Sequence, residues 1–166
     1  EVQHKLQRLY ALACERLAIK PDKGFIAAAM AANPDEARRD PVRRVAHHLF
    51  TYKLAMPSGA WGLLGLGLLH SVLLEVGRED GKKPAPVRIA RADAHDLNGL
   101  AGRLLMPEVD QKDVRRAAAF VEYLLKAKGP RGFLKFGRKM SANGNVDAPS
   151  EAVAGVSTGA LEQKRH

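Results

Sequence analysis

The sequence predicts an all-α protein, a compact bundle of about six to seven helices around a central apolar helix, with an irregular C-terminal tail. Apolar residues make up 46% of the chain but aromatic residues only 5%, and this Leu- and Ala-rich composition favours helices over sheets. Apolar residues also recur at helical spacing. We expect a basic helical domain over residues 1–140 and a flexible or partner-binding extension over residues 141–166.

The central helix is predicted from the longest apolar run, AWGLLGLGLLHSVLLEV, at residues 60–76. A helix of this length spans roughly 25 Å and is shorter than the ~20 apolar residues of a membrane span. We therefore expect a buried helix over Gly59–Val76. Glycines inside a helix cost about 1 kcal/mol each relative to alanine. We expect Gly62, Gly65 and Gly67 where neighbouring helices approach closely, with approach of a ligand as the alternative.

Six further helices are expected, each with local boundary signals. Asn33 and Asp40 precede prolines and are expected N-caps, which leaves room for a separate turn at Asp35–Arg39. Gly129-Pro130 separates the last two helices. The other expected N-caps are Asp22, Ser58, Asp93 and Asp110. The predicted ranges are Val2–Ile19, Lys23–Ala32, Pro41–Met56, Ala94–Leu105, Gln111–Lys128 and Arg131–Met140.

The positive charge lies in the helical domain. The whole chain has a net charge of +9. Two cations and three anions occupy residues 141–166, which gives this part −1, so residues 1–140 carry a net charge of +10. Helical domains this basic most often bind RNA, DNA or an acidic protein surface. The single cysteine, Cys14, excludes an intrachain disulfide framework and fits a reducing, cytoplasmic setting. Because the chain opens at Glu1 without a methionine, we expect residues to precede it in the natural protein.

The densest basic cluster is KAKGPRGFLKFGRK, residues 126–139, with six Lys or Arg and no acidic residue. Arg131, Lys135 and Arg138 follow i, i+4, i+7 spacing and share a helix face, where they can neutralise phosphates. Phe133 and Phe136 lie on another face, either in the core or stacked on bases. The sequence Gly-Pro-Arg-Gly at 129–132 has the GxxG form of KH domains, but a tight helix–helix turn fits the helical surroundings better.

Three further basic clusters are expected to join the first in one continuous groove. They are Arg38, Arg39, Arg43 and Arg44; Lys82, Lys83, Arg88 and Arg91; and Lys112, Arg115 and Arg116. The expected phosphate contacts are Arg43, Arg44, Lys112, Arg115, Arg116, Lys126, Lys128, Arg131, Lys135 and Arg138.

No enzyme motif supports catalysis: the sequence lacks a P-loop, an HExxH motif and a Ser-His-Asp order. We expect a non-catalytic protein without a metal or other cofactor. His95-Asp96 resembles the paired ligands of HD-type metal hydrolases, so a metal-dependent hydrolase is one alternative. His47 and His48 point about 100° apart on a helix and cannot chelate one ion together. His70 is expected to be a hydrogen-bonded core residue.

The segment MPSGAWGLLGLGLLHSVLLEVG, Met56–Gly77, with the basic helix before it, is similar to the small all-helical subunits of class 1, type III-like CRISPR effector complexes. The resemblance covers mainly Pro41–Val76 and more loosely Lys112–Met140, and it departs at Lys82–Arg91 and in the tail. It implies a non-catalytic protein of antiviral defence that stacks in a filament along a guide–target duplex, with basic surfaces facing the nucleic acid.

We therefore expect a nucleic-acid-binding subunit of a larger ribonucleoprotein complex. Its partners are expected to be RNA rather than DNA, together with other protein subunits, and no membrane. Two further alternatives remain open beside the hydrolase. One is a plasmid- or phage-type regulator that binds double-stranded DNA through a recognition helix at Arg131–Met140. The other is an adaptor whose basic surface binds an acidic protein partner.

Overall fold

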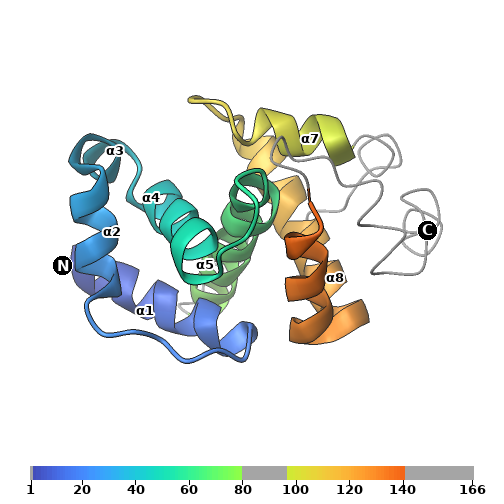
Figure 1. Ribbon diagram of the computed structural model, residues 1–166, viewed down its shortest axis with the longest axis horizontal. Helices are drawn as coiled ribbons and strands as arrows, with labels where there is room; N and C mark the ends of the chain where they lie inside the picture. Colours follow the sequence, from blue (N-terminus) through green and yellow to red (C-terminus); the bar gives the residue numbers. More distant parts are fainter. Residues whose placement is uncertain (1, 80–96, 141–166) are drawn as a thin grey trace.

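A computed structural model describes residues 2–79 and 97–140. Over these ranges the chain forms α-helices and two π-helical segments without a β-strand, which confirms the all-α prediction. In Figure 1 α5 lies in the middle of the fold, where it packs against α1 and α8. The elements are α1 (Val2–Arg16), α2 (Phe25–Ala32), α3 (Pro34–Arg39), α4 (Pro41–His48), η1 (Leu49–Lys53), η2 (Trp61–Leu66), α5 (Gly67–Glu79), α7 (Leu97–Arg103) and α8 (Gln111–Arg138). The predicted tail, most of the long loop and the Asp93 cap lie outside the described residues.

The two predicted N-caps before prolines are confirmed. The side-chain oxygen of Asn33 accepts the backbone N–H of Glu36 at 3.1 Å, and that of Asp40 accepts the backbone N–H of Arg43 at 3.1 Å. Each cap satisfies a backbone donor that the first helical turn leaves unpaired. The chain between α2 and α4 therefore forms the separate short helix α3 (Pro34–Arg39).

Other boundaries differ from the prediction. α2 begins after Gly24, whose φ of 73° places it in the left-handed region. Asp22 does not cap α2, because its carboxylate binds Lys53 Nζ at 2.6 Å. The central helix continues past Val76 to the end of α5. Asp110 does cap α8, accepting the backbone N–H of Lys112 at 2.8 Å.

The predicted central helix is present, but it begins as the π-helix η2 before continuing as α5. The predicted helix Pro41–Met56 likewise becomes π-helical after His48. It ends at Lys53, two residues before Ala55, a non-glycine residue with φ 51°. π-Helical turns are rare and mostly short, and local apolar periodicity does not distinguish them from α-helix.

Close helix approach accounts for the three glycines of the central helix. A methyl group at Gly67 would lie 2.7 Å from the carbonyl oxygen of Ala117 in α8. At Gly62 and Gly65 it would lie 3.1 and 3.3 Å from carbonyl oxygens just after α7 and in α4. One helix therefore packs closely against three neighbours, as the sequence predicts.

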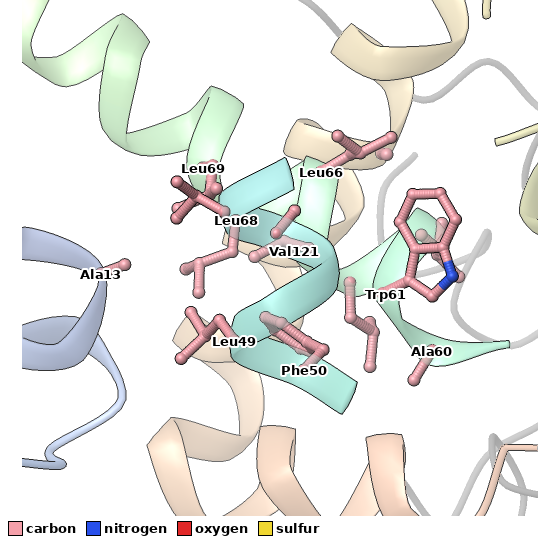
Figure 2. Packing of buried hydrophobic residues seen from close by; sticks show 14 of the residues in the cluster. Ala13, Leu49, Phe50, Ala60, Trp61, Leu66, Leu68, Leu69 and Val121 are labelled. Carbon is pink, nitrogen blue, oxygen red and sulfur yellow. The ribbon is translucent and has the colours of Figure 1, made fainter. Parts of the chain in front are cut away.

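The core joins side chains from α1, η1, η2, α5 and α8, as Figure 2 shows. Ala13, Leu49, Leu68 and Val121 are fully buried there, and each buried leucine stabilises the fold by about 1.5–3 kcal/mol. The predicted inward face of α1 is confirmed. None of the described helices combines the length and apolar character that crossing a bilayer requires.

Ser71 is the polar exception in this core. Its side chain is fully buried in α5, where it accepts a hydrogen bond from Arg16 of α1 and donates one to Glu122 Oε1 of α8 at 3.0 Å. Arg16 also pairs with Glu75. The hydroxyl of Ser71 both accepts and donates a hydrogen bond, so this network ties three helices together without leaving that hydroxyl unsatisfied.

Candidate nucleic-acid interface

α8 folds back on itself at Gly129. This residue has φ 71° and ψ 178°, a backbone conformation that essentially only glycine adopts, and Pro130 follows it. The ring centroids of Phe120 and Phe136, on either side of the turn, lie 5.7 Å apart. In an uninterrupted helix they would lie roughly 24 Å apart. The predicted break is confirmed, and Figure 1 shows the two parts of α8 side by side.

The Gly-Pro-Arg-Gly sequence is a tight turn between the two parts of α8. A methyl group at Gly132 would lie only 2.5 Å from Cβ of Lys128, so the backbone crosses here at very short range. The part of the chain that the structure describes places no strand beside this turn. The arrangement therefore lacks the strand framework of a KH domain.

The second part of α8 presents one basic and one apolar face. Arg131, Lys135 and Arg138 are all exposed, as their helical spacing predicts. Phe133 and Phe136 are 0% exposed, and Phe133 packs against η1 with its ring centroid 6.2 Å from that of Phe50. Base stacking by these two phenylalanines is therefore ruled out in this fold, because neither ring reaches the surface.

The six cations of residues 126–139 are exposed to solvent and can contact a ligand. Lys126, Lys128 and Lys139 are exposed like the three residues of the basic face. Within residues 2–79 and 97–140, none of the six forms an ion pair with a carboxylate. We call this set the α8 basic surface.

At the other end of α8, only part of the predicted cluster remains available. Lys112 and Arg115 are exposed. Arg116 donates to Asp113 Oδ1 at 3.1 Å, and Asp113 also accepts from Arg103 Nε at 3.0 Å. The hydrogen bond from Arg103, with further help from Arg116, holds the pKa of Asp113 below its ordinary value. Asp113 therefore joins α7 to α8 through Arg103, and Arg116 is paired with the same carboxylate within α8. This pairing makes Arg116 a poor candidate for phosphate contact.

Arg43 and Arg44 correct the sequence prediction. Only 7% of Arg43 is exposed; its guanidinium donates to the Leu105 and Met106 carbonyl oxygens and lies 4.8 Å from the centroid of the Trp61 ring. These contacts lock the N-terminal half of α4 to the chain after α7. The side chain is committed to the protein interior and is not available to a phosphate.

Arg44 is 4% exposed. It donates from Nη1 to Glu36 Oε1 at 3.2 Å, and its Nη2 lies 2.8 Å from His47 Nδ1. The contact with His47 is made three residues along the helix. Arg44 therefore joins α3 to α4, and it too is removed from the candidate surface.

The predicted continuous groove is reduced to the two ends of α8. Arg38 and Arg39 are exposed on α3, but Arg38 pairs with Asp35. The cluster from Lys82 to Arg91 lies outside the described residues. The α8 basic surface is the densest group of unpaired cations that the described ranges contain.

The histidines of α4 and α5 are partly buried. Burial, and to a smaller degree the charge of Arg44, lowers the pKa of both His47 and His48. Burial and the charge of Arg115 lower the pKa of His70. His70 is half-buried beside Leu66, whereas the sequence predicted it in the core.

Among the described residues, no three His, Cys, Asp or Glu side chains gather as a metal site would require. The predicted pair His95-Asp96 lies outside these residues.

Two features of the surface were missed at the sequence level. Lys139 was counted in the basic run of residues 126–139 but was not among the expected phosphate contacts. It is exposed and belongs to the α8 basic surface. Tyr52 is 63% exposed and is the most exposed of the large apolar side chains in the described ranges. Its position in a π-helical segment removed the periodic signal that could have revealed it.

Comparisons with known proteins find no family model, no curated protein and no solved structure that matches this chain.

Proposed function

We propose that this protein is a non-catalytic, nucleic-acid-binding helical subunit of a larger ribonucleoprotein assembly, and that the α8 basic surface contacts the sugar–phosphate backbone. The single observation that carries the proposal is the state of the six cations at residues 126–139. They are exposed, they follow one another closely in the sequence, and they form no ion pair with a carboxylate among the described residues. RNA is the proposed ligand ahead of DNA.

Physical chemistry favours a polyanion at this surface. Six neighbouring positive charges repel one another, and a chain of phosphates relieves this repulsion while releasing condensed counterions. The Gly129 turn and the buried Phe133 and Phe136 hold the backbone beneath the surface in place, so binding needs to order only the exposed side chains. Arg131, Lys135 and Arg138 extend over roughly 10 Å of helix, enough for two or three consecutive phosphates of one strand.

Salt titration of RNA binding tests the proposal. Fluorescence anisotropy with a labelled RNA should give an affinity that falls steeply with salt, by roughly 0.7 in log K per log salt for each phosphate contact to a single strand. The triple variant Arg131→Gln, Lys135→Gln, Arg138→Gln should bind more weakly and lose about 2 from that slope. An affinity that is independent of salt would refute the phosphate contacts.

A matched control separates the α8 basic surface from net charge. The variant Lys5→Gln, Arg38→Gln, Arg39→Gln removes the same number of charges from exposed positions on α1 and α3. It should bind RNA with nearly unchanged affinity and slope. If both triple variants lose affinity equally, binding follows net charge and not the surface proposed.

Other experiments discriminate the remaining alternatives. A DNA-binding regulator should select a palindromic duplex and bind it as a symmetric dimer. An adaptor should keep its acidic protein partner after nuclease treatment. Co-purification with natural neighbours, before and after nuclease, tests membership of a ribonucleoprotein assembly.

A further inference from the structure

Four aromatic rings form a ladder from the core to the surface between α1, α2, α4 and η1. Tyr10 and Phe25 stack with centroids 4.0 Å apart and planes within 3°. His48 meets Phe25 edge-on at 5.1 Å, and Tyr52 meets His48 at 4.9 Å. Exposure rises along the ladder from 0% at Tyr10 to 63% at Tyr52. The ladder thus ends in a ring that a further planar group can cover.

The last rungs line a surface depression of about 300 Å³ between α2 and η1. This volume is at the lower end of the range for small-molecule sites. Lys23 and Lys53 lie on its rim with Asp22. Lys53 is paired with Asp22, whereas Lys23 is exposed and makes no ion pair among the described residues. The rim therefore carries a net positive charge beside an exposed ring.

His48 lines the depression, and one of its polar atoms lies beneath the surface, unpaired within the part of the chain that the structure describes. The Nδ1 atom of His48 is buried and has no hydrogen-bond partner within the described ranges, although buried polar atoms are normally paired. Burial lowers the pKa of His48, so its imidazole is neutral near pH 7 and can donate or accept one hydrogen bond. The segment after His48 is π-helical, a geometry often found at functional sites.

We propose that this depression binds a nucleotide, with the base stacked on Tyr52 and the phosphate held by Lys23. The chemistry required is a planar heteroaromatic ring that carries an anionic group. Two sources supply it, a free mononucleotide and an unpaired nucleotide in a strand. The site is separate from the α8 basic surface, because Phe50, two residues before Tyr52, points to Phe133 of α8 while Tyr52 lies beside α2.

Amide NMR titration of the full chain with four probes tests the proposal. AMP should shift the amides of Gly24 and Tyr52, whereas ribose 5-phosphate, which lacks the ring, should bind roughly 5- to 150-fold more weakly. Adenosine, which lacks the phosphate, should also bind more weakly. A single-stranded hexanucleotide tests the strand source, and shifts at Gly132 report separately on the α8 basic surface.

Variants at exposed positions keep the test independent of folding. Tyr52→Ala should lose AMP binding roughly 5- to 150-fold, and Tyr52→Phe should keep it within about twofold because the ring remains. Leu73→Ala, an exposed apolar side chain on α5, is the control and should change nothing. Lys23→Gln should weaken AMP but not adenosine, a difference that unfolding does not produce.

Each outcome decides the proposal. Shifts with AMP, with the hexanucleotide or with both support the site and identify its source. Binding that survives Tyr52→Ala, or ribose 5-phosphate that binds as tightly as AMP, overturns it. Absence of shifts at Gly24 and Tyr52 with millimolar probes also overturns it, and that result leaves the α8 basic surface untouched.

Discussion

The arginines of α4 and those at the end of α8 both lie in basic runs of the sequence, but the first are buried and the second are exposed. Arg43 and Arg44 are buried, and their guanidinium groups contact backbone carbonyls, a tryptophan, a glutamate and a histidine. Arg131 and Arg138 are exposed, and within the described ranges they have no carboxylate partner. Cations in a basic run can therefore either join helices through buried hydrogen bonds and ion pairs or remain exposed as a surface for a ligand.

The difference arises from what lies opposite each helix face. Burying a charged group costs several kcal/mol unless hydrogen bonds and an opposite charge replace water. Around α4, the carbonyls after α7 and Glu36 supply that replacement. The exposed face of α8 has no such partners among the described residues, so its cations remain hydrated and available to a ligand.

The largest expected effect comes from removing a buried guanidinium. Arg44→Ala should lower the free energy of unfolding by about 3 kcal/mol, because it leaves Glu36 and His47 without their partner in a mostly buried place. Arg131→Ala should change it by less than about 0.5 kcal/mol. Urea unfolding of both variants measures the contrast.

Arg38→Ala is the matched control for an arginine whose ion pair is exposed. Its side chain is 73% exposed in the pair with Asp35, and such pairs contribute about 0.2–1 kcal/mol. Equal losses for Arg38→Ala and Arg44→Ala would show that burial does not distinguish the two classes of arginine.

The second prediction concerns the turn that creates the α8 basic surface. Gly129→Ala should destabilise the protein by about 1–3 kcal/mol, because an L-residue is strained at φ 71° and ψ 178°. It should also weaken RNA binding by misplacing Arg131. Thermal unfolding and anisotropy measure the two effects.

Gly102→Ala is the control for the turn. Neither Gly102 nor Gly129 has an atom within 4 Å of an added methyl group, but only Gly129 has a positive φ. Gly102 lies inside α7, so alanine there should stabilise by up to about 1 kcal/mol. A similar sign for both substitutions would contradict the strain at Gly129.

The smallest expected effect is a difference in pH dependence between the two regions. The folded state lowers the pKa of His47 and His48, so the unfolded chain binds more protons below its ordinary histidine pKa of about 6.5. Stability should therefore be retained above about pH 7, fall as the pH drops below about 6.5, and level off below the folded-state pKa values.

Urea midpoints measured between about pH 8 and pH 5 check this dependence, which the double variant His47→Gln, His48→Gln should weaken. The lowered pKa of His70 should leave a remaining dependence of the same sign. RNA affinity should change little from about pH 8 to pH 6.5, because lysine and arginine side chains stay charged there. A histidine at the RNA contact would instead make affinity rise as the pH falls over this range.

Much of the local structure was predictable from short-range signals. The Asn33 and Asp40 caps act within three residues of their own position, and the inward face of α1 follows one helical period. The glycines of the central helix signalled close packing, because nothing else offsets their cost in a helix. The break at Gly129 was predictable from the Gly-Pro pair, because glycine followed by proline interrupts a helix.

The failures share a different physical origin. The π-helical turns depend on how the central helix packs, so apolar periodicity alone predicted ordinary α-helix over the same residues. Tyr52 lies on one of these turns, and its exposure was invisible for that reason. The candidate site changed most at Arg43 and Arg44, where the partners that bury them come from α3 and from the chain after α7.

By itself the sequence determined the helical class, most of the turns, the buried central helix and the place of the densest positive charge, because caps, periodicity and glycine strain act over a few neighbouring residues. Only the tertiary structure decided which cations face water and which aromatic ring ends at the surface. Those outcomes depend on groups brought together from distant parts of the chain. A charged side chain is buried only where a hydrogen-bond or ion-pair partner offsets the cost of removing it from water, and no local sequence pattern specifies that partner.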